Sequence, residues 1–337
     1  MYDFTVCGAG PVGSYLAWKL SEKGFNVLLL EEHEEVGKPL SCSGLVSKRI
    51  WNYVPKEKHL VEREIKGARI HLDKKLFTYR SDQAVVINRV KLDKLLAEKA
   101  KKSGAKLLTR TKLFSFFESK THVSLYIKSD SFKNLKTKVL AGCDGPLSIV
   151  REKMGIPSPK LLHGIFCYVN EEPDYFVDLY FKKVPGFFAW RIPRKDVVEY
   201  GLACEKNAKK YFEKFSRQLK FSYSKVYSGM IPYGLLPKVT SHRVFLCGDA
   251  ASQTKPHTGG GVIYGLRAAE IAATLIKPDN PNMKSYEEEW RRVIGREIKT
   301  GLWIRQFYSA PSPLLSVILS FLMKKQGLDM DEPSSIF

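Results

Sequence analysis

Two glycine-rich stretches of this 337-residue chain carry residue types from which a nucleotide-binding site can be built. The first is GAGPVG, from Gly8 to Gly13, and the second is GDAASQTKPHTGGGV, from Gly248 to Val262. In the second, three consecutive glycines run into IYGLRAAEIAATLI, a pattern that predicts a long helix. Because glycines at a helix start cost conformational entropy, the pattern indicates that something must come very close to the backbone there.

The first stretch has the full sequence context of a dinucleotide-binding motif. An apolar strand leads into Gly8, a helix follows Gly13, and a second strand over Val27 to Leu30 runs into an acidic pair. Gly10 lets a pyrophosphate approach the backbone, while the helix N-terminus offers free amides and the positive end of its dipole. Glu31 can accept hydrogen bonds from ribose hydroxyls. The cofactor-binding residues predicted from this motif are Gly8, Gly10, Pro11, Val12, Gly13, Glu31 and Glu32.

Two later strands are each predicted to end in an acidic residue. VLAGCDGPLSIVREKMGI places Asp144 and Gly145 after a short strand, and HRVFLCGDAAS places Gly248 and Asp249 after the strand Val244 to Cys247. Ligands of open α/β sheets bind at the carboxyl ends of the strands. Asp249 is therefore predicted to hold the ribityl chain of FAD, and all four motif residues are predicted to contact the cofactor.

The three glycines are predicted to bring a helix N-terminus against the flavin ring. Reduced flavin is negatively charged at one edge, and backbone amides with a helix dipole stabilise that charge. Pro256 would stiffen the approach, and Lys255 and His257 would lie near the reactive face or edge. With the three motifs in this order, we predict FAD as the cofactor. The binding residues in this segment are predicted to be Pro256, Gly259, Gly260, Gly261 and Val262.

The motif order resembles the flavoprotein superfamily that includes p-hydroxybenzoate hydroxylase, and it resembles the geranylgeranyl reductases of archaea and plants more closely. The resemblance runs from residue 3 to about residue 276. It rests on the stretches GAGPVGSYLAWKLSEKGFNVLLLEE, GKPLSCSGLVS, VINRVKLDKLL, CDGPLSIVRE, PGFFAWRIPR and GDAASQTKPHTGGG. It implies FAD-dependent reduction of carbon–carbon double bonds in the geranylgeranyl chains of isoprenoid lipids or of geranylgeranyl diphosphate.

The resemblance also assigns roles to a helix start and a loop. VINRVKLDKLL places Arg89 where the matching arginine of similar proteins touches FAD. GKPLSCSGLVS, residues 37–47, is similar to the loop that brings a cysteine near the isoalloxazine, so Cys42, Ser43 and Gly44 are predicted to bind the cofactor.

The proton for the reaction has three candidate sources. An isolated trisubstituted alkene accepts hydride poorly, so protonation must accompany or precede hydride addition. Cys42, His257 or a relayed water molecule can supply that proton, and the sequence leaves the choice open. For Cys42 the alternative is close packing under the flavin, and for His257 it is an ordinary polar loop residue.

The stretch PGFFAWRIPR resembles the substrate-domain motif of the reductases, whose usual form is P-G-x-Y-x-W-x-F-P-K. The predicted substrate-binding residues are Phe188, Trp190 and Pro193. Phe188, Ile192 and Arg194 depart from the motif, which keeps the apolar wall but removes a hydroxyl. From composition alone, such an aromatic stripe also fits the core of a sheet.

We expect an α/β fold in which a discontinuous Rossmann-like FAD-binding domain is combined with an antiparallel β-sheet substrate domain and a C-terminal helical segment. The FAD-binding domain is assigned to residues 1–60, 84–158 and 236–285. The substrate domain is assigned to residues 61–83 and 159–235, and the helical segment to residues 286–337.

The net charge of +20 accompanies 44% hydrophobic and 27% charged residues. The lysines are dispersed and no nucleic-acid motif accompanies them, so we expect no nucleic-acid partner and consider an anionic membrane surface instead. The apolar run PLLSVILSFLM, from Pro313 to Met323, is too short to span a bilayer, which leaves a core helix or an interfacial helix open. Six cysteines without a CxxC pair predict no metal site and a reducing, cytoplasmic location. The basic surface predicts peripheral association on the inner face of the cell membrane.

Two alternative functions stay open. A flavin-dependent monooxygenase or halogenase has the same fold, and FAWRIP is close to the halogenase pattern W-x-W-x-I-P. A non-catalytic flavin-binding module that interacts with lipids is the other. The sequence holds no second intact nucleotide fingerprint, so it does not name the electron donor. NADPH, a ferredoxin or another small carrier all stay open.

Overall fold

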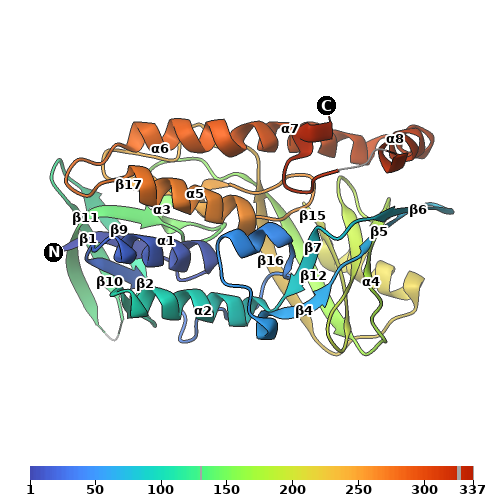
Figure 1. The fold of residues 1–337 in the computed structure, drawn as a ribbon, viewed down its shortest axis with the longest axis horizontal. Coiled ribbons are helices and arrows are strands. Elements are labelled where there is room, and N and C mark those ends of the chain that lie inside the picture. The colour runs from blue at the N-terminus through green and yellow to red at the C-terminus, as the bar shows by residue number, and fades with distance from the viewer. Residues whose placement is uncertain (130, 325–327, 337) are drawn as a thin grey trace.

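The computed structural model describes residues 1–129, 131–324 and 328–336. Figure 1 shows two sheet layers side by side, with the Rossmann-like layer at the left and the second sheet at the right. Helices of the last fifth of the chain run along one side of both layers. Residues 325–327 and 337 of the predicted C-terminal helical segment lie outside the described residues.

The Rossmann-like layer is a mixed sheet with a parallel centre. Its strands are β1 (Tyr2–Cys7), β2 (Val27–Leu30), β8 (Lys106–Leu108), β9 (Lys112–Glu118), β10 (Val123–Lys128), β11 (Phe132–Gly142) and β17 (Val244–Leu246). The order is β8-β2-β1-β11-β10-β9, with β17 beside β11. Neighbours from β8 to β11 and the β11–β17 pair are parallel, whereas β9 and β10 are antiparallel. The predicted Rossmann-like class is confirmed.

Four helices pack on this layer. They are α1 (Pro11–Glu22), α2 (Arg89–Lys102), α3 (Ile149–Lys153) and α5 (Val262–Leu275). Pro11 stands in the first turn of α1, where its missing amide costs nothing. The Asn88 side chain caps α2 by accepting a hydrogen bond from the Lys91 amide at 3.0 Å. Helix α1 packs against both α2 and α5, so the helices that follow the two glycine-rich stretches are neighbours.

The second sheet is antiparallel except for one parallel pair. Its strands are β5 (Gly67–Leu72), β6 (Lys75–Arg80), β12 (Lys160–Val169), β13 (Phe176–Phe181), β14 (Phe188–Pro193), β15 (Val198–Cys204) and β16 (Val226–Tyr233). The order is β16-β12-β15-β14-β13-β5-β6, and only β13 and β5 pair in parallel. Helix α4 (Ala208–Leu219) packs on β12 and β15. The antiparallel sheet expected from the aromatic stretches after residue 159 is therefore present.

A small sheet joins the two layers. It has the order β3-β7-β4 and consists of β3 (Leu45–Ser47), β4 (Val61–Glu64) and β7 (Ala84–Ile87). Strand β7 leads directly into α2, and β3 follows the predicted cysteine loop. This sheet therefore fixes the loop relative to the first turn of α2.

The C-terminal helices bridge both layers. They are α6 (Met283–Trp290), a π-helical turn (Arg291–Gly295), α7 (Arg296–Gln306) and α8 (Ser312–Lys324). Trp290 and Ile298 belong to the core of the Rossmann-like layer, whereas Leu315 and Leu319 of α8 belong to the core of the second sheet (Figure 1). None of the helices in the described part of the chain combines the length and apolar content needed to cross a bilayer.

Candidate functional site

The site is built where the carboxyl ends of β1, β11 and β17 meet. A Cβ at Gly8 would lie 2.4 Å from the Cys143 carbonyl oxygen, and one at Gly13 would lie 2.0 Å from the Gly8 carbonyl oxygen. Both distances are far below van der Waals contact, so only glycine allows these backbones to approach. The Val12 side chain packs 3.1 Å from the Cβ position of Gly248 and thereby joins the first motif to the third.

The motif leaves room for a ligand at Gly10. No heavy atom of the described residues lies within 4 Å of the position that a Cβ would take there. Helix α1 has no side-chain cap, so its first amides have no side chain to bind. Open space in front of uncapped amides is the arrangement that binds a phosphate.

The two predicted acids after β2 have different environments. Glu31 is 9% exposed, and its Oε2 accepts a hydrogen bond from the Ala9 amide at 2.9 Å. Its Oε1 accepts one from the His33 amide at 3.0 Å. Glu32 instead forms a surface ion pair with Lys112 at 2.7 Å. Glu31 is thus tied to the glycine turn, as an acceptor for ribose hydroxyls requires, and Glu32 is not.

Asp144 caps α3. Its Oδ1 accepts a hydrogen bond from the Ser148 hydroxyl at 2.6 Å, and its Oδ2 accepts one from the Val150 amide at 3.0 Å. Burial raises the pKa of Asp144 despite these bonds. Gly145 follows with no atom of the described residues near its Cβ position. The turn therefore borders open space, although the Asp144 carboxylate already serves the helix.

Asp249 is a partly buried carboxyl against the start of α5. A Cβ at Gly261 would lie 2.6 Å from Asp249 Oδ1, so a side chain cannot replace this glycine. Burial raises the pKa of Asp249 to about 6, and the charge of Arg89 opposes that rise. Within the described ranges, no hydrogen-bond donor reaches the carboxyl. Helix α5 likewise begins without a side-chain cap.

These features match the polar groups of FAD. Uncapped amides with open space at Gly10 suit the phosphates, and Glu31 suits the ribose hydroxyls. The unpartnered Asp249 carboxyl suits a ribityl hydroxyl, and the uncapped start of α5 suits the anionic edge of the flavin. The residues present therefore fit FAD.

The cysteine loop lies on the first turn of α2. The backbone at Gly44 is so close to β7 that a Cβ would lie 2.2 Å from the Ile87 carbonyl oxygen. Arg89 interacts with both the Cys42 thiol and the Asp93 carboxylate, the latter at 3.2 Å. Burial lowers the pKa of Arg89, but Asp93 and Cys42 outweigh this and raise it above its ordinary value. The structure thus brings the predicted Cys42, Ser43, Gly44 and Arg89 together.

A buried ion pair ties this loop to the second sheet. Arg194 donates to the Ser43 carbonyl oxygen and to Glu199 Oε2, the latter at 2.9 Å. Trp190 Nε1 donates to the other oxygen of Glu199 at 2.9 Å. Glu199 is fully buried, and burial raises its pKa to about 7 although Arg194 and Trp190 both oppose the shift. The stretch PGFFAWRIPR therefore positions the cysteine loop through Arg194, in addition to supplying the aromatic residues predicted to bind substrate.

An aromatic wall meets the cofactor loop. Phe187, Phe188 and Trp190 are all buried, and Phe187 stacks on Phe188 with centroids 4.2 Å apart. Phe187 Cζ lies 3.4 Å from the Cβ position of Gly259. Pro193 ends β14, and the buried aromatic residues belong to the second core. The predicted Phe188 and Trp190 are thus core residues of the sheet, and their neighbour Phe187, which was not predicted, borders the glycine loop.

His257 lies between the glycine loop and α7. It is 7% exposed, and its Nδ1 is 2.7 Å from the Cβ position of Gly301. Burial and then the charge of Lys255 lower the pKa of His257 to about 3. The imidazole is therefore neutral near pH 7. No described residue forms a hydrogen bond with Nδ1.

Lys255 forms a buried ion pair with Asp331, a residue that the sequence analysis did not predict for the site. Its Nζ lies 2.8 Å from Asp331 Oδ1, and both side chains are almost fully buried. The Tyr264 hydroxyl donates to the Asp331 carbonyl oxygen at 2.7 Å, so the C-terminal segment also holds α5. A lysine in an apolar loop implies a buried counter-charge. No pattern in the sequence shows which acid supplies it.

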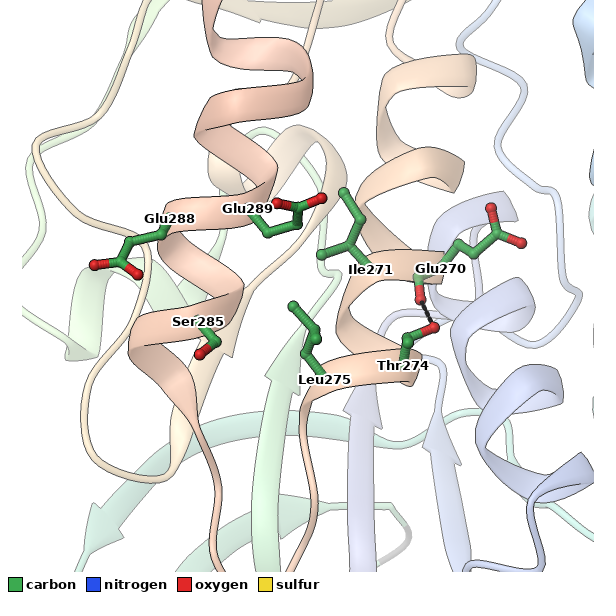
Figure 2. Close-up of a pocket in the computed structure, with 7 residues that line it drawn as sticks. All are labelled: Glu270, Ile271, Thr274, Leu275, Ser285, Glu288 and Glu289. Atoms are coloured by element: carbon green, nitrogen blue, oxygen red, sulfur yellow. Dashed lines mark hydrogen bonds between the residues drawn. The ribbon is translucent and has the colours of Figure 1, made fainter.

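A separate surface pocket of about 400 Å³ lies between α5 and α6 (Figure 2). Its lining is Glu270, Ile271, Thr274, Leu275, Ser285, Glu288 and Glu289. It borders the second half of α5, away from the glycine-rich start of that helix. Its carboxylates make it unsuited to the phosphates of FAD.

Comparisons with known proteins agree with this site. A model described as an FAD binding domain matches residues 46–166, and one described as an NAD(P)-binding Rossmann-like domain matches residues 6–42. An uncharacterized protein, MJ1520, of Methanocaldococcus jannaschii is 29% identical over 97% of this chain and 90% of its own length. The digeranylgeranylglycerophospholipid reductase of Methanothrix thermoacetophila is 26% identical over 91% of this chain and 87% of its own length.

A solved structure is also similar. It is a geranylgeranyl bacteriochlorophyll reductase-like protein from Thermoplasma acidophilum, with a TM-score of 0.88 and 22% identity. It covers 99% of this chain and 94% of its own chain, so the two folds correspond nearly from end to end. The domain match and the groups of the site together identify FAD as the cofactor.

Gly10 and Gly13 are expected to respond differently to alanine. Gly10→Ala should fold with unchanged thermal stability, because its Cβ meets open space, but should bind FAD at least about tenfold more weakly because the methyl group occupies that space. Gly13→Ala should lose stability as well, because its Cβ overlaps the Gly8 carbonyl oxygen. Melting of the FAD-free proteins and FAD titration by fluorescence quenching measure both. Wild-type FAD affinity in Gly10→Ala would contradict the assignment.

Asp331→Asn should destabilise the protein by about 3–5 kcal/mol, because Lys255 would keep a buried charge without its partner. Urea unfolding measures the loss, and bound flavin absorbance shows whether FAD is released. The double variant Lys255→Met with Asp331→Leu removes both charges and should recover most of the stability. An unchanged unfolding free energy in Asp331→Asn would show that the pair does not form.

Glu199→Gln should weaken the pH dependence of stability. The folded-state pKa of about 7 lies above the ordinary value of 4.5, so the stabilisation from protonated Glu199 is complete below about pH 4.5 and is lost as the pH rises through about 7. Urea midpoints at about pH 5 and about pH 8 should therefore differ less in the variant than in the wild type. Glu62→Gln removes the other carboxylate on Arg194, whose charge also raises the pKa of Glu199, and should therefore weaken the slope less than Glu199→Gln does.

Proposed function

We propose that this chain, an FAD-dependent oxidoreductase of the geranylgeranyl reductase family, saturates double bonds in the geranylgeranyl chains of isoprenoid lipids. The observation that carries the proposal is the contact between the apolar aromatic wall and the cofactor loop, where Phe187 packs against Gly259. A hydrocarbon chain lying along this wall would contact aromatic side chains next to the cofactor loop. The digeranylgeranylglycerophospholipid reductases similar to this chain support the same substrate class.

The protein must exclude water from the site, orient the alkene and deliver a proton. Reduced FAD supplies the electron pair and one of the two hydrogens that saturate a double bond. The second hydrogen arrives as a proton, and the buried wall of Phe187, Phe188 and Trp190 keeps bulk water from competing for it. The uncapped start of α5 stabilises negative charge at its end of the site.

Cys42 is the better placed of the two predicted proton donors. Its side chain is partly exposed, and the neighbouring guanidinium of Arg89 is the kind of charge that stabilises the anion left after proton donation. His257 is neutral and packed against α7, so it has only a single ring N–H to offer. We therefore propose that Cys42, directly or through water, delivers the proton, and that His257 shapes the glycine loop.

Electrons come from an external donor in this proposal. NADPH, a ferredoxin or another small carrier could reduce the flavin, and the described residues carry only the nucleotide site already assigned.

A monooxygenase or halogenase would instead consume oxygen, and a non-catalytic module would leave reduced flavin unchanged. These outcomes distinguish the three functions.

We further propose that the protein works at an anionic membrane surface. Its substrate class is a lipid whose chains reside in a bilayer, and its net charge of +20 attracts acidic headgroups. Peripheral association would keep the enzyme near its substrate without a spanning helix.

The decisive measurement is anaerobic turnover. The protein is reduced with dithionite and mixed with a digeranylgeranyl glycerol-ether phospholipid, and lipid masses are compared before and after. We expect the flavin to reoxidise while the lipid gains the mass of two hydrogen atoms for each saturated double bond. Reduced flavin that persists, or that reacts only when oxygen is admitted, would rule out the reductase function.

A matched pair of variants tests the proton donor in the same assay. Cys42→Ser should keep FAD but slow product formation by about 100-fold, the typical contribution of general acid catalysis. His257→Gln should stay within about threefold of the wild type, because its imidazole faces α7. The opposite order of effects would transfer the role to His257.

A further inference from the structure

Helix α8 carries an apolar face that no other described element covers. Leu314, Val317 and Phe321 are 50%, 67% and 69% exposed and follow one another at spacings of three and four residues. Residues at these spacings lie on the same side of a helix, so they form a single stripe. Within this stripe, Phe321 presents most of its aromatic ring to solvent.

The opposite side of α8 is firmly packed. Leu315 and Leu319 are buried in the core of the second sheet, and Ser316 accepts a hydrogen bond from Lys75 at 2.8 Å. The helix also packs along β6, whose Lys75 and Phe77 lie on the side of the strand that faces it. The exposed stripe is therefore held in a fixed orientation, and Figure 1 places α8 and β6 at one end of the molecule.

Basic side chains lie at both ends of α8 and on its packed side. Exposed Lys324 ends the helix, Lys182 donates to the Tyr308 and Ala310 carbonyl oxygens just before it, and Lys75 binds Ser316 on the packed side. Residues 298–328 contain no aspartate or glutamate, although Asp73 lies in the neighbouring turn between β5 and β6. An apolar face within a basic, nearly acid-free region is complementary to an acidic lipid surface and not to bulk water.

We propose that the exposed face of α8 inserts into the headgroup boundary of an anionic phospholipid bilayer. The apolar side chains enter the acyl boundary while exposed Lys324 contacts lipid phosphates. The interaction surface is defined as Leu314, Val317 and Phe321. A second copy of this chain lacks the matching acidic surface on this face, which is why a bilayer is the favoured occupant.

This orientation has a consequence for substrate entry that rests on the proposed function. The buried side of α8 shares a core with Phe187, Phe188 and Trp190. A bilayer on the outer side of α8 would therefore lie against an element that belongs to the same core as the wall along which the prenyl chain is proposed to bind. The prenyl chain would then pass from the membrane to the site without crossing water.

Two equally exposed phenylalanines provide a matched test. Phe321→Glu removes the 69%-exposed ring of α8, and Phe132→Glu removes a 70%-exposed ring on β11, at the opposite end of the molecule (Figure 1). Both variants change the net charge equally. Holoenzyme is sedimented with vesicles of phosphatidylcholine alone or mixed with phosphatidylglycerol, at low and high salt, without any prenyl substrate.

The wild type and Phe132→Glu should bind the phosphatidylglycerol vesicles, and high salt should weaken that binding. Phe321→Glu should bind at least about tenfold more weakly while keeping its flavin content. Equal binding by both variants, or no salt-sensitive binding by the wild type, would overturn the proposal. A wild-type dimer that Phe321→Glu dissociates would assign the face to self-association instead. Because the vesicles contain no prenyl substrate, failure of the reductase function would leave these results unchanged.

Discussion

The site depends on how closely three backbones approach one another at the carboxyl ends of β1, β11 and β17. Gly8 lies against the carbonyl of Cys143, and Gly248 lies against Val12 in the first turn of α1. These contacts leave no space for side chains between the motifs, so the polar groups at this edge are main-chain amides and a few short carboxyl side chains. The ligand is therefore bound largely by backbone, and its position follows from the sheet itself.

Charged side chains, as well as apolar packing, fix the position of the second sheet relative to this edge of the Rossmann-like sheet. Arg194 reaches from the end of β14 to the Ser43 carbonyl oxygen, while Glu199 holds both Arg194 and Trp190. Breaking one partner of such a buried network costs more than the network contributes when it is intact. This asymmetry makes the pair effective at excluding other positions of the Cys42 loop, even where its net stabilisation is small.

The sequence predicted the parts of the site that are local in the chain. The strand–glycine–helix pattern around Gly8, the acid at Asp249 and the helix after Gly261 each depend on neighbouring residues, and the structure contains them. Asp331 could not be predicted, because its partner Lys255 is 76 residues away and pairing at that separation depends on the path of α6, α7 and α8. The environment of His257 was also hidden, because it depends on Gly301 in α7.

Residues near the C-terminus contact the glycine loop and the helices beside it. Asp331 binds Lys255, its carbonyl oxygen binds Tyr264, and Ser334 binds Glu297 of α7. The glycine loop therefore receives its counter-charge from a segment that follows α8 in the chain. Burial makes Lys255 costly without Asp331, so a loop built from glycines, which has little rigidity of its own, gains a fixed shape from a distant carboxylate. The glycine loop must be rigid because it sets the position of the α5 N-terminus against the charged flavin ring. Amides that are already in place stabilise charge better than amides that must reorient during the reaction.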